Sequence, residues 1–367
     1  MNFCSDNVTG IAPDIIAALL AANEGAAMPY GNDPWTQRLT AQFCDLFETE
    51  VMVFPVATGS AANALALSVM TPPFGAIYCH ADSHINADEC GAPELYTGGA
   101  KLIPLAGEHG KLRPSHLQQV LDRAGAGVVH HIQPAAVSIT QATEAGTVYE
   151  IEEVQSIASV AQSHHLYLHM DGARFANAIV HLGCRPAEIT WKAGVDVLSF
   201  GATKNGALAA EAVVFFNRSL ADTFAFRRKR GGHLFSKLRF LSAQLSAYLT
   251  DHLWLRQATH ANQMAITLAE GLKLLPGVQL SHPVEANEVF IWLPDDTIHR
   301  LYNAGFQFYR WQEALNEAGQ TGAIVRLVTA FNTQICDVEA FITTASAPGP
   351  DRPQPSLSQP DSGLGDS

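Results

Sequence analysis

The chain has 367 residues, of which 47% are hydrophobic and 16% are charged. That length exceeds the usual limit for a single hydrophobic core, so we expect a large domain and a smaller one. The formal net charge of −13 argues against a nucleic-acid partner, because nucleic acids are usually bound by a basic protein face.

No segment of the sequence has the pattern of a signal peptide or of a membrane span. The first residues lack the basic and apolar regions of a signal peptide, and the longest wholly apolar run, Ile15–Ala22, is too short to cross a bilayer. The six cysteines form no CxxC pair, which is typical of free thiols in a reducing compartment. We therefore expect a cytoplasmic protein with no membrane partner.

Helix and strand patterns alternate from the start of the chain. Polar, turn-rich residues precede a helix over 13–22, and a loop over 29–34 separates it from an amphipathic helix over 36–47. Val51–Val56 has the pattern of a buried strand.

The strand over 51–56 is followed by a turn of small residues that leads into a helix. Such a turn directs free backbone N–H groups and the positive end of the helix dipole at a phosphate group. Gly59 and Ser60 are the candidates for this role. A tight turn with a serine cap has the same sequence pattern, so the turn alone decides nothing.

A short strand over 76–79 leads into a segment rich in histidine and acidic residues. Asp82, Cys90, His80 and His84 are residue types that ligate metals, but the segment starts after a strand and gives no helical context for an HxxxH pair, so we predict no metal site. We expect one of the two histidines to lie over an aromatic cofactor instead.

Further strands and helices follow in alternation. Strands are expected over 101–105 and 128–132, and helices over 114–124 and 151–164. Residues 137–145 are rich in serine and threonine and are expected near a site. This alternation predicts a mostly parallel, doubly wound α/β sheet.

Two strands then deliver charged residues at their ends. The alternating strand over 166–171 ends at Asp171, and Gly172, Ala173 and Arg174 follow directly. After a short helix over 189–193, the strand over 195–200 leads through small residues to Lys204. Open α/β sheets place their chemistry at the carboxyl ends of strands, and a buried lysine is costly unless it is paired or used covalently.

The last third of the chain is expected to form a smaller α+β domain. Long helical stretches cover 220–255 and 258–275. Three strands and one helix are expected after them, with the strands over 278–280, 288–293 and 323–329 and the helix over 297–303. We expect an N-terminal arm and helix over 1–30, a large domain over 31–250, a small domain over 251–346 and a disordered tail over 347–367.

Lys204 is either an ordinary loop lysine or a Schiff-base lysine that holds pyridoxal phosphate (PLP). PLP needs an acid beside its pyridine nitrogen, for which Asp171 is suited, and backbone donors for its phosphate. An amino-acid substrate also needs a cation that grips its carboxylate in two places, and arginine is better suited than lysine. Arg174 and Arg326 are the candidates, and Arg326 interrupts an otherwise apolar strand.

Four segments together resemble the L-threonine aldolase family. They are His169–Arg174, Ser199–Gly206, Ser5–Asn7 and Val325–Thr329, and the resemblance extends over about residues 3–340. It implies a PLP-dependent enzyme of fold type I, the fold of aspartate aminotransferase. The stretch over 88–94 also resembles the related phenylserine aldolases.

The resemblance implies a role for each matching residue. Lys204 would form the imine, Asp171 would pair with the pyridine nitrogen, and His84 would stack on the ring. The remaining residues would bind cofactor or substrate: Gly59 and Ser60 the phosphate, Ser5, Arg174 and Arg326 the substrate carboxylate, and Tyr30 and Lys229, with its neighbour Arg228, a neighbouring subunit's site. Arg174 and Lys229 are also candidate cofactor-binding residues, and the family forms homotetramers that are dimers of dimers.

The sequence departs from the family in one loop. Many members have a second active-site histidine where this chain reads Ser138–Thr143, and no histidine is present there. The base that takes the hydroxyl proton therefore stays open between His84, a water held by it, and His131.

The implied reaction is cleavage of L-threonine, L-allo-threonine and related β-hydroxy-α-amino acids to glycine and an aldehyde, acetaldehyde for threonine. The alternatives are a phenylserine aldolase, which would release benzaldehyde and glycine, and a non-catalytic PLP-fold binding protein.

Overall fold

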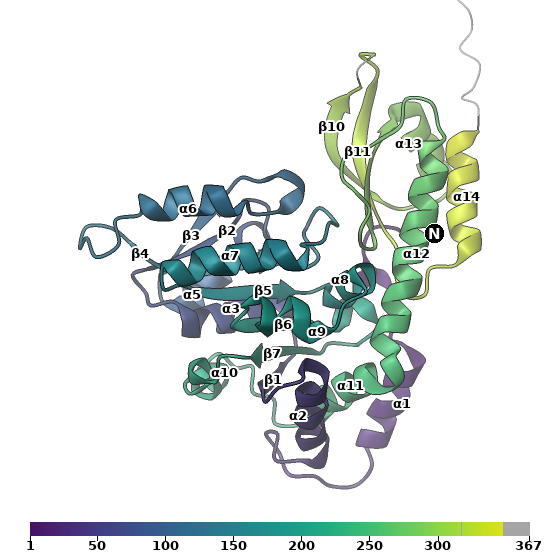
Figure 1. Ribbon diagram of the computed structural model, residues 1–367. Helices are drawn as coiled ribbons and strands as arrows, with labels where there is room; N and C mark the ends of the chain where they lie inside the picture. Colours follow the sequence, from purple (N-terminus) through teal and green to yellow (C-terminus); the bar gives the residue numbers. More distant parts are fainter. Residues whose placement is uncertain (317, 348–367) are drawn as a thin grey trace, which may run out of the picture.

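The computed structural model describes residues 1–316 and 318–347, and these form two lobes, each built on a β-sheet (Figure 1). The larger sheet has the strand order β1-β7-β6-β5-β4-β2-β3. Six of its strands run in one direction and β7 runs against them. The strands are β1 (Met52–Val56), β2 (Gly75–His80), β3 (Lys101–Leu105), β4 (Gln133–Thr140), β5 (Tyr167–Gly172), β6 (Val197–Gly201) and β7 (Glu211–Phe215).

Helices cover both faces of the larger sheet, which is why its central strands are buried along their whole length. One core lies against α2, α6, α7, α8 and α11, and a second core, on the opposite face, lies against α3, α4 and α10. The doubly wound, mostly parallel sheet predicted from the sequence is therefore confirmed. The helices of this lobe are α1 (Pro13–Ala22), α2 (Pro34–Phe47), α3 (Gly59–Met70), α4 (His84–Ala87), α5 (Ala92–Thr97), α6 (Pro114–Asp122), α7 (Ile151–Ser163), α8 (Phe175–Leu182), α9 (Pro186–Ile189), α10 (Phe224–Arg230) and α11 (Arg239–Leu249).

The smaller sheet is antiparallel and has the strand order β10-β11-β9-β8. Three helices pack on it and form a separate core, which also contains Phe3 from the start of the chain. One of these helices, α12, reaches both lobes, because Trp254 packs in the core of the large sheet and Leu268 in that of the small one. The elements are β8 (Gln279–Leu280), β9 (Glu288–Pro294), β10 (Tyr309–Leu315), β11 (Thr321–Val328), α12 (Leu253–Lys273), α13 (Asp295–Asn303) and α14 (Ile335–Ser346).

The N-terminal segment is tied to the smaller sheet by backbone hydrogen bonds. The Phe3 N–H donates to the Gln307 carbonyl at 2.8 Å, and the Phe3 carbonyl accepts from the Val328 N–H at 2.8 Å. The next residues form a short 3-10 helix, η1 (Asp6–Val8), which packs against η4 (Thr203–Asn205) of the larger lobe. The start of the chain therefore lies where the two lobes meet.

The prediction of a strand over 128–132 was wrong, because the strand in this region is β4, which begins at Gln133. The preceding residues form turns, with Val128 N–H bonded to Gly125 O at 3.0 Å and His131 N–H to Val128 O at 3.0 Å. The apolar Val129 is 92% exposed, so the apolar run that suggested a strand is on the surface.

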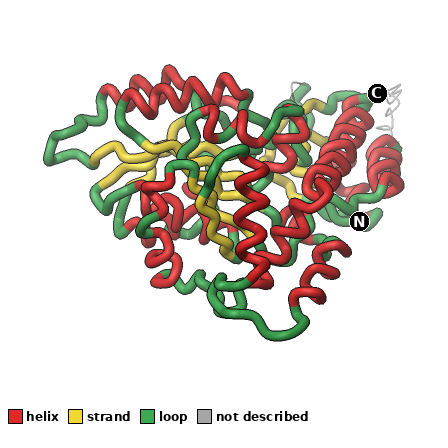
Figure 2. Tube along the Cα trace, turned by 60° about the horizontal axis from the view of Figure 1, so that its bottom comes forward, coloured by secondary structure: helices red, strands yellow, loops and turns green. Residues whose placement is uncertain are grey.

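The long helical stretch expected over 220–255 is not continuous, because it is broken into α10, α11 and the start of α12 (Figure 1). Figure 2 colours the helices of the chain red and the loops that separate them green. Gly231 and Gly232 end α10, and Gly232 has a left-handed backbone with φ of +80°. A second break, η6 (Thr250–His252), separates α11 from α12, and Asp251 and His252 both have positive φ there.

Several elements were not expected from the sequence, among them α4, α5, α8, β7, β10 and α14. Most side chains of β10 are exposed or half-buried, so its sequence carries little apolar signal. No helix of the described residues is both long and apolar enough to cross a membrane. The tail predicted to be disordered lies outside the described residues, apart from Ala347.

Candidate active site

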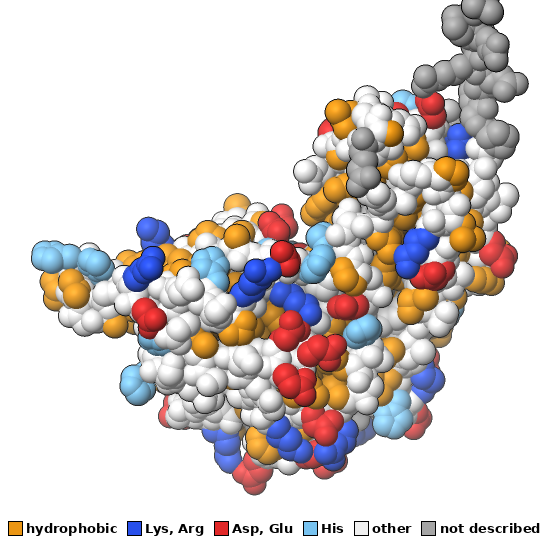
Figure 3. Space-filling model, turned by 45° about the horizontal axis from the view of Figure 1, so that its top comes forward, with side chains coloured by type: hydrophobic (Ala, Val, Ile, Leu, Met, Phe, Trp, Pro, Cys, Tyr) orange, Lys and Arg blue, Asp and Glu red, His pale blue; other side chains and the backbone are white. Residues whose placement is uncertain are grey.

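The carboxyl ends of the parallel strands bring several predicted site residues to one edge of the larger sheet. Thr140 of β4 is paired with Asp171 of β5, and Asp171 with Ser199 of β6. The turns at these ends are close-packed: a Cβ on Gly201 would lie 2.6 Å from the Ala173 carbonyl oxygen, so only glycine fits. Figure 3 shows basic, acidic and histidine side chains on the face that includes the corner between the two lobes.

Lys204 lies in η4, three residues after the end of β6, as the sequence predicted. It is half-buried, and among the described residues it forms no hydrogen bond or ion pair. Its positive charge acts on buried Asp6, on His84 and on buried Glu211. A half-buried lysine without a carboxylate partner is unusual for a structural residue and is suited to covalent use of its Nζ.

Asp171 is a buried acid with well-defined hydrogen-bond donors. Its Oδ2 accepts from Asn63 Nδ2 at 2.7 Å, and its Oδ1 accepts from the Ala173 N–H at 3.0 Å. Directly behind it in β5, His169 is bonded to Ser138 Oγ at 2.9 Å and to Ser199 Oγ at 3.0 Å. Burial lowers the pKa of His169 to about 4, so this imidazole is neutral and serves the core.

His84 is the first residue of α4, and its side chain is 38% exposed. Its Nδ1 is 2.8 Å from Glu89 Oε1, and its backbone N–H donates to Glu144 Oε1 at 2.8 Å. The hydrogen bond to Glu89 raises the pKa of His84 above its ordinary value, burial opposes that shift, and Asp171 adds to it. Thr140 Oγ1 also donates to Glu144 Oε1, at 2.9 Å.

The start of α3 has the geometry of an anion-binding helix terminus. The Thr58 hydroxyl accepts from the Ala61 N–H at 3.2 Å and so caps the helix. The N–H groups of Gly59 and Ser60 precede the first N–H that bonds within the helix, that of Ala62, which donates to the Thr58 carbonyl at 3.1 Å. A Cβ on Gly59 would meet no atom within 4 Å, so the space above this turn is open.

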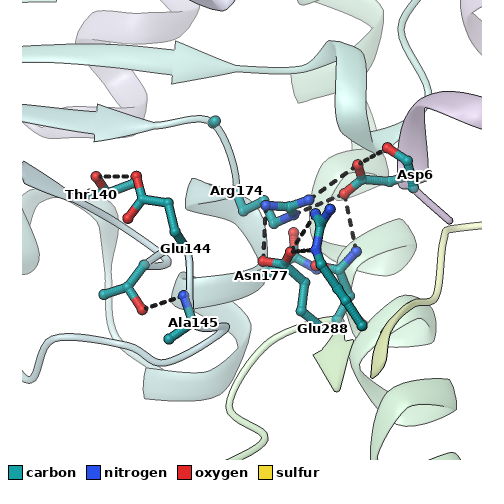
Figure 4. Close-up of polar contacts among 12 residues, drawn as sticks. Asp6, Thr140, Glu144, Ala145, Arg174, Asn177 and Glu288 are labelled. Carbon is teal, nitrogen blue, oxygen red and sulfur yellow. Dashed lines mark hydrogen bonds and ion pairs between the residues drawn. The ribbon is translucent and has the colours of Figure 1, made fainter. Parts of the chain in front are cut away.

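Two arginines and two buried acids form a continuous chain of ion pairs across the two lobes (Figure 4). Asp6 Oδ2 is 2.9 Å from Arg174 Nε, and Arg174 Nη1 is 2.9 Å from Glu288 Oε2. Glu288 Oε1 then accepts from Arg326 Nε at 3.0 Å and Nη2 at 2.7 Å. Burial alone would lower the pKa of Arg174, but Asp6 and Glu288 outweigh burial and raise it.

Ser5 contacts the chain of ion pairs, because its hydroxyl donates to Asp6 Oδ1 at 3.5 Å, whereas the residues expected to reach a neighbouring subunit lie apart from it. The Ser5 hydroxyl accepts from the Asn7 N–H at 3.1 Å, which caps η1 beside Asp6. Lys229 Nζ lies 5.0 Å from the centre of the Tyr30 ring, and both residues are exposed. In the described chain neither side chain forms a hydrogen bond or ion pair with Gly59, Ser60 or Lys204.

Arg228, the neighbour of Lys229, points the other way and is buried. Its Nη1 donates to the Pro55 carbonyl at 3.1 Å, and its guanidinium lies 5.2 Å from the centre of the Phe54 ring. Burial lowers the pKa of Arg228 to about 10. Of the four consecutive basic residues Arg227–Arg230, Arg228 is therefore the buried one, and the other three are exposed.

The loop that lacks the second histidine has a structural glutamine and an acid. Gln141 is fully buried and bonds twice to the backbone of Tyr149, at 2.9 Å each. Glu144 is the acid, and burial raises its pKa to about 7. His131 precedes β4 and so lies at the opposite end of that strand from Thr140, far from His84 within one chain.

Sequence reasoning missed five polar residues that hold the site residues in place: Asp6, Asn63, Glu89, Glu144 and Glu288. Asp6 and Glu89 lay within stretches already singled out, so their sequence carried a signal. Glu288 also carried a signal, because it is an acid at the start of an apolar strand, and the structure shows that it is 1% exposed. Among the described residues, no group of three or more histidine, cysteine or acidic side chains is arranged to hold a metal ion.

Comparison with known proteins identifies the family. Residues 2–296 match the family model described as beta-eliminating lyase. The chain is 47% identical to the low specificity L-threonine aldolase of a Pseudomonas species, over 84% of this chain and 88% of that protein. It is 45% identical to the low specificity L-threonine aldolase of Pseudomonas aeruginosa, over 91% of this chain and 93% of that protein.

The fold of the chain also matches that of a known threonine aldolase. The solved structure of threonine aldolase from Leishmania major superposes with a TM-score of 0.87 at 28% identity, covering 94% of this chain and 98% of that one. This match confirms the fold type expected from the motifs. The chain therefore belongs to the beta-eliminating lyase family and, within it, to the low-specificity L-threonine aldolases.

Proposed function

We propose that the protein is a PLP-dependent, low-specificity L-threonine aldolase that cleaves L-threonine and L-allo-threonine to glycine and acetaldehyde. The observation that carries this proposal is the unpaired, half-buried Lys204 at the same sheet edge as buried Asp171. The identity to aldolases from two Pseudomonas species supports the substrate class.

The residues at this edge fit PLP. Lys204 would hold the cofactor through Nζ, Asp171 would pair with the ring nitrogen, and the Gly59 and Ser60 N–H groups would bind the phosphate. His84 would lie over the ring. When bound, PLP supplies an electron sink for the pair released by cleavage of the Cα–Cβ bond.

Asp171 is held in a fixed orientation by two donors. Asn63 Nδ2 donates to its Oδ2 and the Ala173 N–H donates to its Oδ1. A carboxylate in this place would pair with a protonated ring nitrogen, and a protonated ring accepts electrons more readily.

The two arginines are suited to different parts of substrate binding. Arg174 uses Nε, Nη1 and Nη2 in its pairs with Asp6 and Glu288. Arg326 uses Nε and Nη2 on Glu288, and its Nη1 has no hydrogen-bond partner among the described residues. Arg326 would therefore make the direct contact with the substrate carboxylate, Arg174 would complete the positive site, and Ser5 would add a hydroxyl.

His84 is the best-placed base for the β-hydroxyl proton. Its Nε2 has no hydrogen-bond partner among the described residues, whereas Nδ1 is engaged by Glu89. His84, directly or through a water, would accept the hydroxyl proton as the Cα–Cβ bond breaks and acetaldehyde leaves. The carbon that becomes the glycine methylene then takes up a proton.

Tyr30 and Lys229 would serve a neighbouring subunit. Both side chains are exposed, and the Lys229 ammonium lies over the Tyr30 ring. This position on the surface supports a role outside this chain's own site. We propose a homotetramer, a dimer of dimers, in which the Lys229 ammonium contributes to the partner's cofactor site. Six free cysteines support a cytoplasmic location.

The experiment that tests the proposed function combines a spectrum with a product assay. Purified protein should absorb near 420 nm, the general signature of lysine-bound PLP, and the band should change when glycine is added. Threonine should then yield acetaldehyde, and phenylserine, assayed in parallel, tests for benzaldehyde. A protein with the band but without either aldehyde would be a non-catalytic PLP-binding protein, and a protein without the band would refute the cofactor assignment.

A further inference from the structure

Four buried or half-buried side chains form one continuous line of hydrogen bonds from Asp171 to His84. Asn63 Nδ2 donates to Asp171 Oδ2 at 2.7 Å and to Glu89 Oε1 at 2.8 Å. Glu89 Oε1 in turn lies 2.8 Å from His84 Nδ1. The line connects helix α3, the loop after α4 and strand β5, so it is made by the tertiary fold.

The orientation of the Asn63 amide determines which atoms in this line donate and which accept. Its amide nitrogen carries two hydrogens, and both are given to carboxylates, so the amide cannot be turned without facing its oxygen toward a negative oxygen. Its own Oδ1 is buried and has no hydrogen-bond partner among the described residues. Leaving that oxygen unpaired is costly, so the two contacts to carboxylates determine the orientation of the amide.

The same geometry determines which nitrogen of His84 carries the hydrogen. Glu89 Oε1 is an acceptor for Asn63, and His84 Nδ1 contacts this same oxygen. Burial raises the pKa of Glu89, but Oε1 already accepts from Asn63, so a proton on this carboxyl would be on Oε2. Oε1 is therefore an acceptor in either form, and Nδ1 must be the donor. A neutral imidazole has one N–H, and its lone pair is then on Nε2.

We propose that Glu89 and Asn63 are positioning residues that hold His84 in its Nδ1–H form, so that Nε2 is the nitrogen that accepts the proton during cleavage. This inference rests on the proposed aldolase function and assigns a role to two residues outside the substrate and cofactor contacts. Glu89 orients and polarises the base, and Asn63 links that base to the acid that would pair with the cofactor ring.

The charged groups around His84 come from four elements. Glu89 follows α4, Asp171 ends β5, Lys204 lies in η4, and Glu144, from the loop after β4, faces the backbone N–H of His84. Of the two carboxylates that act on the imidazole, Glu89 alone contacts it. Removal of the Glu89 charge should therefore change the pKa of the imidazole more than removal of any other single charge.

The tautomer can be measured directly and without any activity assay. In full-length protein labelled with ¹⁵N-histidine, the Nδ1 and Nε2 shifts of His84 distinguish the two neutral forms. The His84→Phe variant identifies the signals by their loss. The Nδ1–H form in the wild type supports the proposal, and the Nε2–H form would overturn it whether or not the protein proves to be an aldolase.

Glu89→Gln separates the charge from the hydrogen bond. Because Asn63 donates to the oxygen that faces His84, the glutamine oxygen should take that place, and its NH₂ should take the place of Oε2, which has no partner among the described residues. The Nδ1–H form should persist, while the imidazole pKa falls and the acid limb of kcat/KM for threonine moves to lower pH. We expect kcat/KM at neutral pH to fall roughly tenfold, less than the loss of a whole acid–base group.

A matched control and a second variant complete the test. Asp82→Asn removes an acid from the same region whose side chain is 80% exposed, and it should not move the acid limb. Asn63→Ala removes the link while keeping Glu89, and its His84 should show a mixture of tautomers. An acid limb and imidazole pKa in Glu89→Gln equal to those of the wild type would refute the positioning role.

Discussion

Arg326 donates two hydrogen bonds to a single oxygen of Glu288, on the neighbouring antiparallel strand. This pair explains how a cation is tolerated within an otherwise apolar strand, because the buried charge is matched across the sheet. It also leaves Nη1 of Arg326 available for a ligand. The substrate carboxylate would thus meet an arginine that is already oriented.

We expect Arg326→Lys to weaken substrate binding strongly, although the charge is kept. A lysine ammonium cannot bond to Glu288 and to a carboxylate with the fixed planar geometry of a guanidinium. The KM for threonine should rise by an amount equivalent to about 1–3 kcal/mol, the usual cost of a charged hydrogen bond. Steady-state kinetics measures this, and an unchanged KM would show that the arginine serves structure only.

Lys204→Ala should abolish cleavage and leave the fold intact. The ammonium forms no ion pair with any described residue, so its removal leaves no buried acid without a partner. Because Lys204 is half-buried and its charge favours the ionised forms of buried Asp6 and Glu211, the free energy of unfolding should fall by about 1 kcal/mol, a typical value for one substitution. The 420 nm band and the acetaldehyde yield are the measurements, and Lys101→Ala, at the exposed start of β3, is the control. Cleavage in the Lys204 variant would reject the assignment.

Asp171→Asn should reduce both turnover and stability. The two oxygens of Asp171 accept from two N–H donors, so an asparagine must direct its own NH₂ at one of them. That clash should cost about 1–3 kcal/mol in the free energy of unfolding, measured by denaturant titration. Turnover should fall because the cofactor ring would lose its acidic partner. Wild-type turnover in this variant would mean that another acid fills the role.

His84→Phe distinguishes stacking from proton transfer. Phenylalanine keeps an aromatic face, so cofactor binding should persist, but it cannot take a proton. We expect a loss of about 10²–10⁴-fold in rate and the disappearance of the acid limb from the pH–rate profile. Near-normal turnover with the limb unchanged would restrict His84 to a stacking role.

Glu211 should make stability depend on pH. It is buried between the ends of β1 and β6, and burial raises its pKa to about 7. A group with a raised pKa in the folded state stabilises the fold fully below its unfolded pKa, and this contribution is lost as pH rises through about 7. Glu211→Gln should therefore lessen the decline in unfolding free energy between pH 5 and about 8.

Denaturant titrations at a series of pH values check the Glu211 prediction. Glu24→Gln, an exposed position, serves as the control. A pH dependence that is the same in Glu211→Gln and the wild type would mean that Glu211 is ionised in the folded protein at acidic pH.

The strands that deliver the site residues could be predicted from the sequence, and many of their contacts could not. Lys204 and Asp171 follow apolar runs of strand length, so local pattern placed them at strand ends. Glu288 and Glu89 are in stretches with a sequence signal, but no local pattern indicates that their partners are Arg326 and His84. The break at Gly231 was missed for the opposite reason: helix-forming residues on both sides outweighed two glycines.

The ion pair between Asp6 and Arg174 has a consequence for handling of the protein. Removal of the first eight residues, by a protease or by choice of a later start codon, would take away one of the two carboxylates that neutralise a buried guanidinium. It would also remove Phe3 from the core of the small lobe. An N-terminally clipped preparation should therefore bind amino acids poorly even though every residue proposed to contact the cofactor is still present.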